Sequence, residues 1–362
     1  MSDSRPSRLA ALSDALTHGH LDALLVSNLA NIRYLTGFTG SSALLFVSRA
    51  DVLLVTDFRY ETQVREEVGD LARVSIETQS LWTGIFRMME RVANVQVVGF
   101  EATSLVHRDF QRLADQAARW TWRPTDEIIE ALRECKDPDE VERIREAGRI
   151  ATTALEYTLH RVHPGMTELQ VAGTLEKALR DAGSEWYPFP TIIASGERSA
   201  LPHARSSSRV IERGDFLLLD FGATHEGYVS DVTRTVVVGH ADARQREVHA
   251  LVREANERGT RSIRAGMHGR EADAIARDFL TERGFGAAFG HGLGHGIGLE
   301  IHEAPRLGRT VEGVLREGAV VTIEPGIYEP GWGGVRIEDD VHLAPDGTEL
   351  LTHFTRELLE LV

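Results

Sequence analysis

The segment GDFLLLDFG at residues 214–222 returns as GAVVTIEPG at residues 318–326. Each copy is typical of a buried strand that carries an acid near its end, Asp220 in the first copy and Glu324 in the second. Upstream of both copies, a Gly-Met pair precedes a helix-like segment. Because the matched register lands on acids, we interpret this part of the chain as a duplicated unit whose two halves contribute to one site.

A second acid follows each copy, and a histidine lies between the copies. Asp231 and Glu338 lie on strand-like segments, whereas His295 lies in the glycine-rich segment HGLGHGIG at residues 291–298, which we expect to be a loop. Buried carboxylates need a cation to neutralise them. Four carboxylates and one neutral imidazole balance two divalent ions, and an oxygen-rich set of this kind favours Mn²⁺ or Co²⁺, with Zn²⁺ and Fe²⁺ as alternatives. The pattern therefore predicts a two-metal hydrolase.

The composition limits the classes of partner. A length of 362 residues suggests two domains. The 40 basic and 55 acidic residues give a net charge of −15, which argues against nucleic acid or an anionic membrane as a partner. The single cysteine, Cys135, excludes an internal disulfide and a zinc site of paired cysteines. The sequence has no apolar signal segment and no transmembrane run, so we expect a cytoplasmic protein.

The apolar pattern predicts a first domain at residues 1–127 and a second at residues 128–362. In the first, strand-like and helix-like segments alternate, as in an α/β domain. Its expected strands are 23–27, 42–47, 52–56, 95–100 and 120–124, and its expected helices 8–16, 61–67 and 108–118. The second begins with a helix at 139–161 whose N-cap should be Asp137. Further helices are expected at 168–182, 241–263 and 269–283, and strands at 216–221, 229–238, 319–324 and 335–343.

Other polar residues lie close to the expected ligands. Because alternate residues of a strand share a face, Arg336 should project toward the same face as Glu338, where it could hold a bridging carboxylate or a substrate group, or form a structural ion pair. The histidines His203, His291 and His302 could be ordinary surface or turn residues when each is taken alone. They become candidates for function only together with the acids.

Five motifs together resemble peptidase family M24, the superfamily of methionine aminopeptidases, proline dipeptidases and creatinases. They are LDFG at 219–222, SDVTRT at 230–235, GHGLGHGIG at 290–298, TIEPGIY at 322–328 and VRIED at 335–339. Residues 31–41 and 56–60 also resemble the N-terminal domain of the proline-specific branch. The resemblance implies an α/β N-terminal domain followed by an α+β catalytic domain of the pita-bread fold with internal pseudo-symmetry.

The resemblance also implies the roles of the ligands. Asp231 and Glu338 would bridge two metal ions, Asp220 would chelate one, and His295 and Glu324 would complete the other. Methionine aminopeptidases generally lack the N-terminal domain and creatinases have lost the metal ligands. A metal-free amidinohydrolase of the creatinase kind and a non-catalytic binding protein with this fold are therefore alternatives that the intact ligand set disfavours.

Further residues have implied roles in catalysis and substrate binding. Glu324 would also take the proton from the attacking water, which two metal ions activate. His203 and His302 would line a pocket for proline and steady the oxyanion, with His291 nearby. Arg336 and Tyr328 are the remaining candidates for substrate contact within the matched motifs. The expected substrate is a small peptide with proline at its second position.

Arg306 bears on the type of proline peptidase. It follows His302 at a position where several prolidases use an arginine to bind the free carboxylate of a Xaa-Pro dipeptide, and a guanidinium pairs well with a carboxylate. We therefore expect a dipeptidase, with a Xaa-Pro aminopeptidase that acts on longer peptides as the alternative. Relatives with this N-terminal domain are commonly dimers, so we also expect a homodimer.

Overall fold

The computed structural model describes residues 3–362. The chain divides into two compact units, the first ending at Arg133 and the second running from Glu134 to Val362. The boundary expected after residue 127 differs from this division by one short helix, α6 (Glu130–Arg133). Asn31 of the first unit donates to Glu130 Oε1 over 2.6 Å and accepts from Arg133 Nη1 over 2.7 Å. These contacts attach α6 to the first unit.

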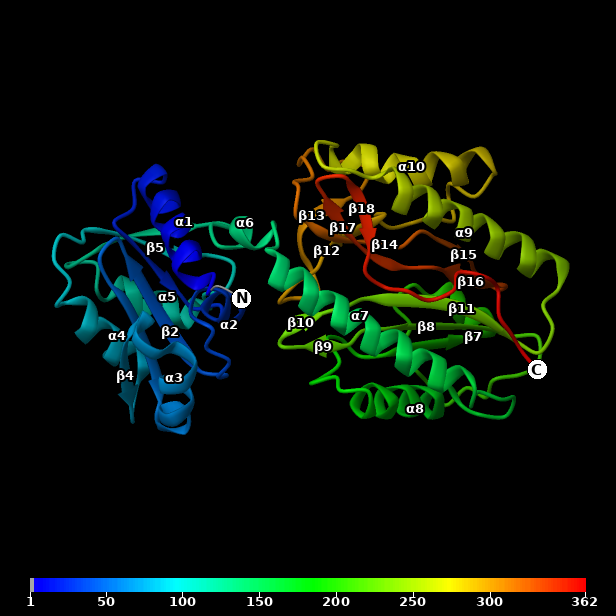
Figure 1. The fold of residues 1–362 in the computed structure, drawn as a ribbon, viewed down its shortest axis with the longest axis horizontal. Coiled ribbons are helices and arrows are strands. Elements are labelled where there is room, and N and C mark those ends of the chain that lie inside the picture. Colours follow the sequence, from blue (N-terminus) through cyan, green and yellow to red (C-terminus); the bar gives the residue numbers. More distant parts are fainter. Residues whose placement is uncertain (1–2) are drawn as a thin grey trace. The chain divides into compact units, whose positions relative to one another are not determined.

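The first unit is a six-stranded mixed sheet with helices on its faces (Figure 1). The alternation of helices and strands agrees with the predicted α/β domain, but the strand at residues 73–77 was not expected. The strand order is β4-β3-β2-β1-β5-β6, in which β2 is antiparallel to β1 and β3 and the other neighbours are parallel. The strands are β1 (Ala23–Val26), β2 (Ala43–Ser48), β3 (Val52–Asp57), β4 (Arg73–Glu77), β5 (Val97–Glu101) and β6 (Thr121–Thr125). The helices besides α6 are α1 (Arg5–His18), α2 (Leu29–Thr36), α3 (Glu61–Val68), α4 (Leu81–Met89) and α5 (His107–Ala114).

The second unit contains two larger sheets. The first, in the order β19-β11-β8-β7, and the second, in the order β13-β12-β14-β17-β18, lie between two pairs of helices (Figure 1). The first sheet comprises β7 (Ile192–Ser195), β8 (Phe216–Phe221), β11 (Val232–Val238) and β19 (Glu360–Leu361). The second comprises β12 (Gly294–Gly296), β13 (Glu303–Leu307), β14 (Val320–Ile323), β17 (Asp339–Ala344) and β18 (Gly347–Leu350). Two short hairpins form separate two-stranded sheets: β9 (Thr224–His225) with β10 (Tyr228–Val229), between β8 and β11 in the chain, and β15 (Gly326–Glu329) with β16 (Gly333–Arg336), between β14 and β17.

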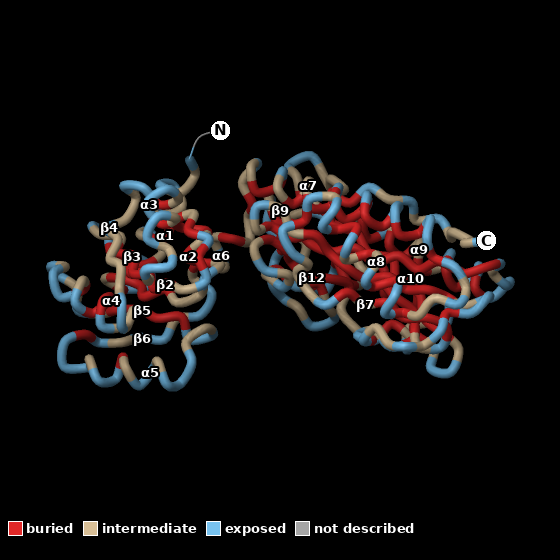
Figure 2. Tube along the Cα trace, turned by 90° about the horizontal axis from the view of Figure 1, so that it is seen from below, coloured by how far each residue is buried: buried red, intermediate tan, exposed pale blue. Residues whose placement is uncertain are grey.

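Each sheet is covered by one helix pair. Helices α7 (Pro138–Leu159) and α8 (Glu168–Asp181) enclose a core with the first sheet, and α9 (Ala243–Ser262) and α10 (Gly269–Glu282) enclose a core with the second. Figure 2 shows these cores as continuous buried tracts of chain beneath exposed helix surfaces. Asp137 caps α7 through a reciprocal capping box with Glu140, as predicted. The four helices begin and end within a few residues of the expected ranges.

Backbone hydrogen bonds reveal the duplication of the second unit. Before α8, the amide of Gly165 donates to Ile211 O over 2.9 Å, and before α10, the amide of Gly266 donates to Leu315 O over 2.8 Å. Both glycines have positive φ, 95° and 90°. The residues that follow form equivalent bridges, Thr167 with Val210 and His268 with Val314. The two halves therefore share their backbone pairing as well as their sequence register.

Two expected features of this unit differ in the structure. His295, expected in a loop, lies in the short strand β12, paired with Arg306 of β13. The strand expected at 335–343 is interrupted at residues 337–338, because β16 pairs with β15 while β17 pairs with β14. Among the helices of residues 3–362, none is long and apolar enough to cross a membrane.

Candidate metal centre

The five expected ligands come from the central strands of both sheets. Asp220 lies in β8, opposite Thr233 of the neighbouring strand β11. Asp231 immediately precedes β11, and Glu324 immediately follows β14. Glu338 lies in the interruption between β16 and β17, where it forms an isolated bridge with Thr233. Together with His295 of β12, all five line one cavity of about 990 Å³.

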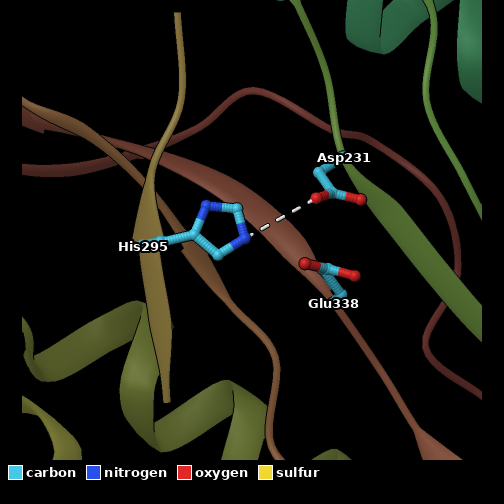
Figure 3. Close-up of side chains that lie close together, drawn as sticks. All are labelled: Asp231, His295 and Glu338. Carbon is cyan, nitrogen blue, oxygen red and sulfur yellow. Dashed lines mark ion pairs between the residues drawn. The ribbon is translucent and has the colours of Figure 1, made fainter. Parts of the chain in front are cut away.

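Three of these residues converge most closely. Atoms of Asp231, His295 and Glu338 that could bind a metal ion all lie within 4.8 Å of one another (Figure 3). His295 Nε2 lies 3.8 Å from Asp231 Oδ2 and 3.6 Å from Glu324 Oε1. His295 Nδ1 lies 3.1 Å from the carbonyl oxygen of Gly296, which assigns the ring proton to Nδ1 and turns the Nε2 lone pair toward the acids.

Burial makes this cluster of acids costly. It raises the pKa of all four carboxyl groups, to about 8 for Glu324. For Asp231 the neighbouring charges of Glu338 and Asp220 raise the pKa further. Burial also lowers the pKa of His295 to about 4, so the imidazole is neutral at pH 7.

The donor set fits divalent metal ions. Asp231 Oδ1 is buried and has no hydrogen-bond partner among the described residues, and the lone pair of His295 faces two carboxylates without an intervening donor. A cation between these groups would give both Asp231 Oδ1 and the His295 lone pair a partner, because a cation accepts lone pairs from oxygen and nitrogen alike. The ligand geometry thus favours a metal centre over a network of plain hydrogen bonds.

Neighbouring residues orient the ligands. Arg336 is buried and donates to Asp220 Oδ2 over 2.5 Å and to the Tyr328 hydroxyl over 2.8 Å. Thr233 donates to Glu338 Oε2 over 2.6 Å, and the amide of Asp231 donates to Asp340 Oδ2 over 3.0 Å. Arg336 therefore holds the carboxylate of Asp220 in a buried ion pair.

Thr233 and Asp340 were not expected as site residues. Thr233 lies two residues after Asp231 and Asp340 lies two residues after Glu338. An alternating pattern read outward from each ligand was the available signal, because every second residue of a strand shares a face. For Asp340 that signal is weakened by the interruption of the expected strand.

The three candidate histidines lie at the same cavity in different surroundings. His203 and His302 line its wall, and the ring of His302 packs edge-on against His295 with centroids 4.4 Å apart. His291 also lines the cavity, but its two nitrogens lie 2.8 Å from Gly292 O and 2.9 Å from the Tyr328 hydroxyl. Burial lowers the pKa of His291 to about 4, so it is a neutral member of a hydrogen-bonded pair.

Two further candidates differ in their access to the cavity. Arg306 lines it from β13 and is exposed to solvent. Tyr328 is buried outside the set of lining residues, and its hydroxyl contacts Arg336 and His291. Its expected contact with substrate stays a prediction, since its contacts in the structure support other residues of the site.

Comparison with known families matches both units. Residues 142–345 match the model of metallopeptidase family M24, and residues 8–135 match that of the creatinase/prolidase N-terminal domain. A Xaa-Pro dipeptidase of Pyrococcus furiosus is 37% identical over 354 residues, which cover 97% of this chain and 99% of the relative.

Solved structures agree over the full length. A Xaa-Pro dipeptidase from Bacillus anthracis superposes with a TM-score of 0.95 at 39% identity, covering 99% of this chain and 100% of the other. An X-Pro aminopeptidase from Thermotoga maritima superposes with a TM-score of 0.89 at 36% identity, covering 97% and 99%. The combination of an N-terminal α/β unit and a pita-bread unit, expected from the resemblance, is confirmed.

Proposed function

The chain belongs to metallopeptidase family M24, and we propose that it hydrolyses the peptide bond that precedes proline, with Xaa-Pro dipeptides as its main substrates. The observation that carries this proposal is the convergence of four carboxylates and a neutral histidine on one cavity, which Arg306 also lines from the strand paired with that of His295. The acids supply the chemistry of a metallopeptidase. The arginine supplies a partner for the free carboxylate of a dipeptide.

Five residues would hold divalent metal ions, and we propose two ions per subunit, Mn²⁺ or Co²⁺ ahead of Zn²⁺ or Fe²⁺. The ligands are Asp220, Asp231, His295, Glu324 and Glu338. When bound, the ions lower the pKa of a bound water and so supply a nucleophile at neutral pH. The buried position of the ligands and the support of Arg336 and Thr233 would keep the set in place without reorganisation.

Glu324 is the proposed proton carrier of the reaction. Burial raises the pKa of its carboxyl group to about 8 when no cation is bound, so the surroundings of this group favour proton uptake. It would take the proton from the attacking water and deliver it to the proline nitrogen as the C–N bond breaks. This delivery matters because a tertiary amide leaves as an amine only after its nitrogen is protonated.

The histidines would hold the substrate during these proton transfers. His302 would donate a hydrogen bond to the oxyanion, and burial lowers the pKa of its imidazole, which favours the neutral ring. His203 lines the cavity from the segment between β7 and β8 and would contact the same oxyanion or the proline ring. His291 would support this wall through its contact with Tyr328.

A Xaa-Pro aminopeptidase is the second candidate. Its supporting observation is the volume of the cavity, about 990 Å³, which extends past the ligands to Leu169 and Glu176 on α8 and leaves room beyond a dipeptide. A similar chain of known structure is an X-Pro aminopeptidase. The exposed guanidinium of Arg306 favours the dipeptidase instead, because it would bind most strongly to a substrate whose free carboxylate directly follows proline.

One comparison separates these functions. A Xaa-Pro dipeptide, a Xaa-Pro-Yaa tripeptide and a dipeptide without proline are each assayed with Mn²⁺, Co²⁺ and Zn²⁺. Preference for the Xaa-Pro dipeptide supports the proposal, and equal or faster cleavage of the tripeptide supports the aminopeptidase. Cleavage of none of the three with any of the metals would contradict both.

Two further properties stay predictions. We propose that the protein is a homodimer, because relatives with this N-terminal domain commonly are. The cytoplasmic location expected from the sequence also stays a prediction. The proposed reaction depends on neither property.

A further inference from the structure

A fully buried carboxylate at the start of α8 has no part in the reaction described above. Glu168 is the first residue of the helix and is 0% exposed. Its Oε1 accepts from the amide of Ser195 over 2.8 Å and from the Ser195 hydroxyl over 2.9 Å. Its Oε2 accepts from the amide of Ser207 over 3.0 Å and from the Ser207 hydroxyl over 2.6 Å.

The two serines are the ends of one segment. Ser195 ends β7, and residues 196–206 then form a 3₁₀ turn followed by a stretch without regular structure before Ser207. Arg198 within this segment also donates to Glu168, with 3.2 Å to each oxygen. A single carboxylate therefore closes the base of a surface segment by binding both of its ends and one residue between them.

This segment carries His203 to the wall of the cavity. His203, Leu201 and Arg205 are exposed, whereas Ala204 is buried and the carbonyl oxygen of Pro202 accepts from Arg336 Nη1 over 3.3 Å. The position of the His203 ring then depends on the base of the segment together with this contact of Pro202. Because a buried charge accepts stronger hydrogen bonds than a neutral group, Glu168 is well suited to fix that base.

The internal repeat shows that the carboxylate is not required by the scaffold. In the second half, Gly269 occupies the position equivalent to Glu168, directly after the bridging residue. A Cβ atom at Gly269 would lie 2.4 Å from the carbonyl oxygen of Arg306, so the backbone of the other substrate-facing segment passes close over this position. The first residue of the helix therefore supports a cavity-lining segment in both halves. Glu168 does so through its carboxylate for the segment of His203, and Gly269 does so by letting the backbone of Arg306 approach closely.

We propose that Glu168 is a positioning residue for His203 and thereby sets the rate of cleavage before proline. This inference rests on the proposed function, in which His203 contacts the substrate. Glu168 acts through the segment 196–206 and touches neither substrate nor metal ligands.

The variant Glu168→Gln tests this proposal, because it keeps the shape of the side chain and removes two of its acceptor positions. One amide oxygen can still accept from one serine, but the amide nitrogen then faces the N–H of the other serine. We expect kcat/KM for a Xaa-Pro dipeptide to fall about tenfold to a hundredfold, since a misplaced catalytic contact costs on that order.

A double-mutant cycle with His203→Ala separates positioning from general damage. If Glu168 acts through His203, the loss caused by Glu168→Gln should disappear in the His203→Ala background. The matched control is Val171→Ala on the same helix, a fully buried core residue whose apolar side chain makes no hydrogen bond to the segment. It should lower the melting temperature, leave kcat/KM unchanged and combine additively with His203→Ala.

A second readout does not depend on activity. In metal-free protein, Glu168→Gln should accelerate hydrogen exchange at the amides of Ser195 and Ser207 and through residues 196–206, while Val171→Ala should not do so selectively. Should Glu168→Gln fail to fold, Ser207→Ala removes one hydroxyl donor and should give a several-fold loss with the same coupling to His203.

The outcomes distinguish this inference from the proposed function. If the wild-type protein cleaves Xaa-Pro dipeptides but the losses of Glu168→Gln and His203→Ala simply multiply, Glu168 is not a positioning residue for His203. Unchanged exchange of residues 196–206 in Glu168→Gln would overturn it as well. If the wild-type protein cleaves no Xaa-Pro peptide, the proposed function fails, and the exchange experiment still tests whether Glu168 fixes the segment.

Discussion

The carboxylate of Asp231 and the imidazole of His295 approach to 3.8 Å from opposite halves of the internal repeat (Figure 3). Asp231 precedes β11 of the first sheet, and His295 lies in β12 of the second. Neither side chain supplies a proton to the other, because the Nδ1–H of His295 is directed at Gly296 O. A divalent cation between them would accept electron pairs from both side chains and so join the two halves of the repeat.

Removal of metal should destabilise the second unit. Chelated protein keeps buried carboxyl groups of raised pKa close together, and bound divalent ions would neutralise them. Addition of Mn²⁺ or Co²⁺ at about 100 times its dissociation constant should stabilise the fold by about 2.7 kcal/mol. Calorimetric melting of chelated and reloaded protein measures this gain, and hydrolysis should return in parallel.

The variant Glu338→Gln provides the control for this experiment. It removes one buried acid while its side-chain oxygen can still accept from Thr233. The chelated variant should melt above the chelated wild type, since one costly ionisable group is gone, and it should gain less on addition of metal. A variant that behaves like the wild type in both respects would contradict an ion-binding role for Glu338.

Arg336→Lys should weaken metal binding while keeping the positive charge. Arg336 contacts Asp220, Tyr328 and Thr233 at once, and a lysine ammonium cannot span the three. Loss of such an orienting partner typically costs about tenfold to a hundredfold in metal affinity. Competition with a chelator measures the affinity. Arg5→Lys, which breaks a similar fork with Asp3 in the first unit, should leave it unchanged.

The helices of the second unit could be predicted from the sequence because their start signals are local. Asp137, Thr167 and Asp242 each accept from the amide three residues on and form capping boxes. Helix α2 was missed although Asn28 caps it and Gly37 ends it with a φ of 80°. Its short length and the glycines that follow it obscured the pattern.

The ligand set was expected from its position in the repeat, but the local structure at two ligands was not. Gly294 and Gly296 flank His295, and Cβ atoms there would lie 1.9 Å from Thr322 O and 2.1 Å from Ala304 O. These glycines let β12 fit between two strands, and this information lies in the partner strands and not in the segment itself. The interruption at Glu338 likewise arises from a change of partner strand.

Acidification should destabilise the fold partly through His249. This histidine of α9 is 3% exposed, and burial, with Arg253 and Arg234 nearby, lowers its pKa to about 4. The unfolded chain takes up this proton near pH 6.5, whereas the folded chain does not until about pH 4. Stability is therefore full above pH 6.5 and falls as the pH drops toward 4, by about 1–2 kcal/mol between pH 7 and 5.

His249→Gln removes this titration. Urea unfolding of chelated wild type and variant at pH 7 and pH 5 isolates the contribution, because the other titrating groups are common to both proteins. The variant should lose less stability than the wild type across this range. An equal loss in both proteins would mean that His249 is protonated alike in the folded and unfolded states.

Sedimentation should show a homodimer at micromolar concentration. The expectation derives from relatives with the same N-terminal domain, in which a neighbouring subunit often closes the mouth of the active site. Residues 31–41 of the first unit are the segment that we expect near that mouth. A fully active monomer at this concentration would refute the prediction.

Arg306→Ala should distinguish dipeptides from tripeptides. If Arg306 binds the free carboxylate after proline, its loss removes a charge-assisted contact of about 1.5–3 kcal/mol, or roughly tenfold to a hundredfold in kcat/KM. The loss should fall on Xaa-Pro dipeptides far more than on Xaa-Pro-Yaa tripeptides. Arg306→Lys should recover only part of it, because lysine lacks the planar fork.

Arg309→Ala is the matched control, because it removes the same charge three residues further along and Arg309 lies outside the cavity lining. It should affect both substrates little and equally. Since Arg306 faces His295 across the β12–β13 pair, a carboxylate bound at its guanidinium would lie beside the metal ligands, where the bond before proline must be placed. If wild-type protein cleaves the tripeptide at least as well, and Arg306→Ala leaves the ratio of the two rates unchanged, the dipeptidase assignment is wrong and the aminopeptidase takes its place.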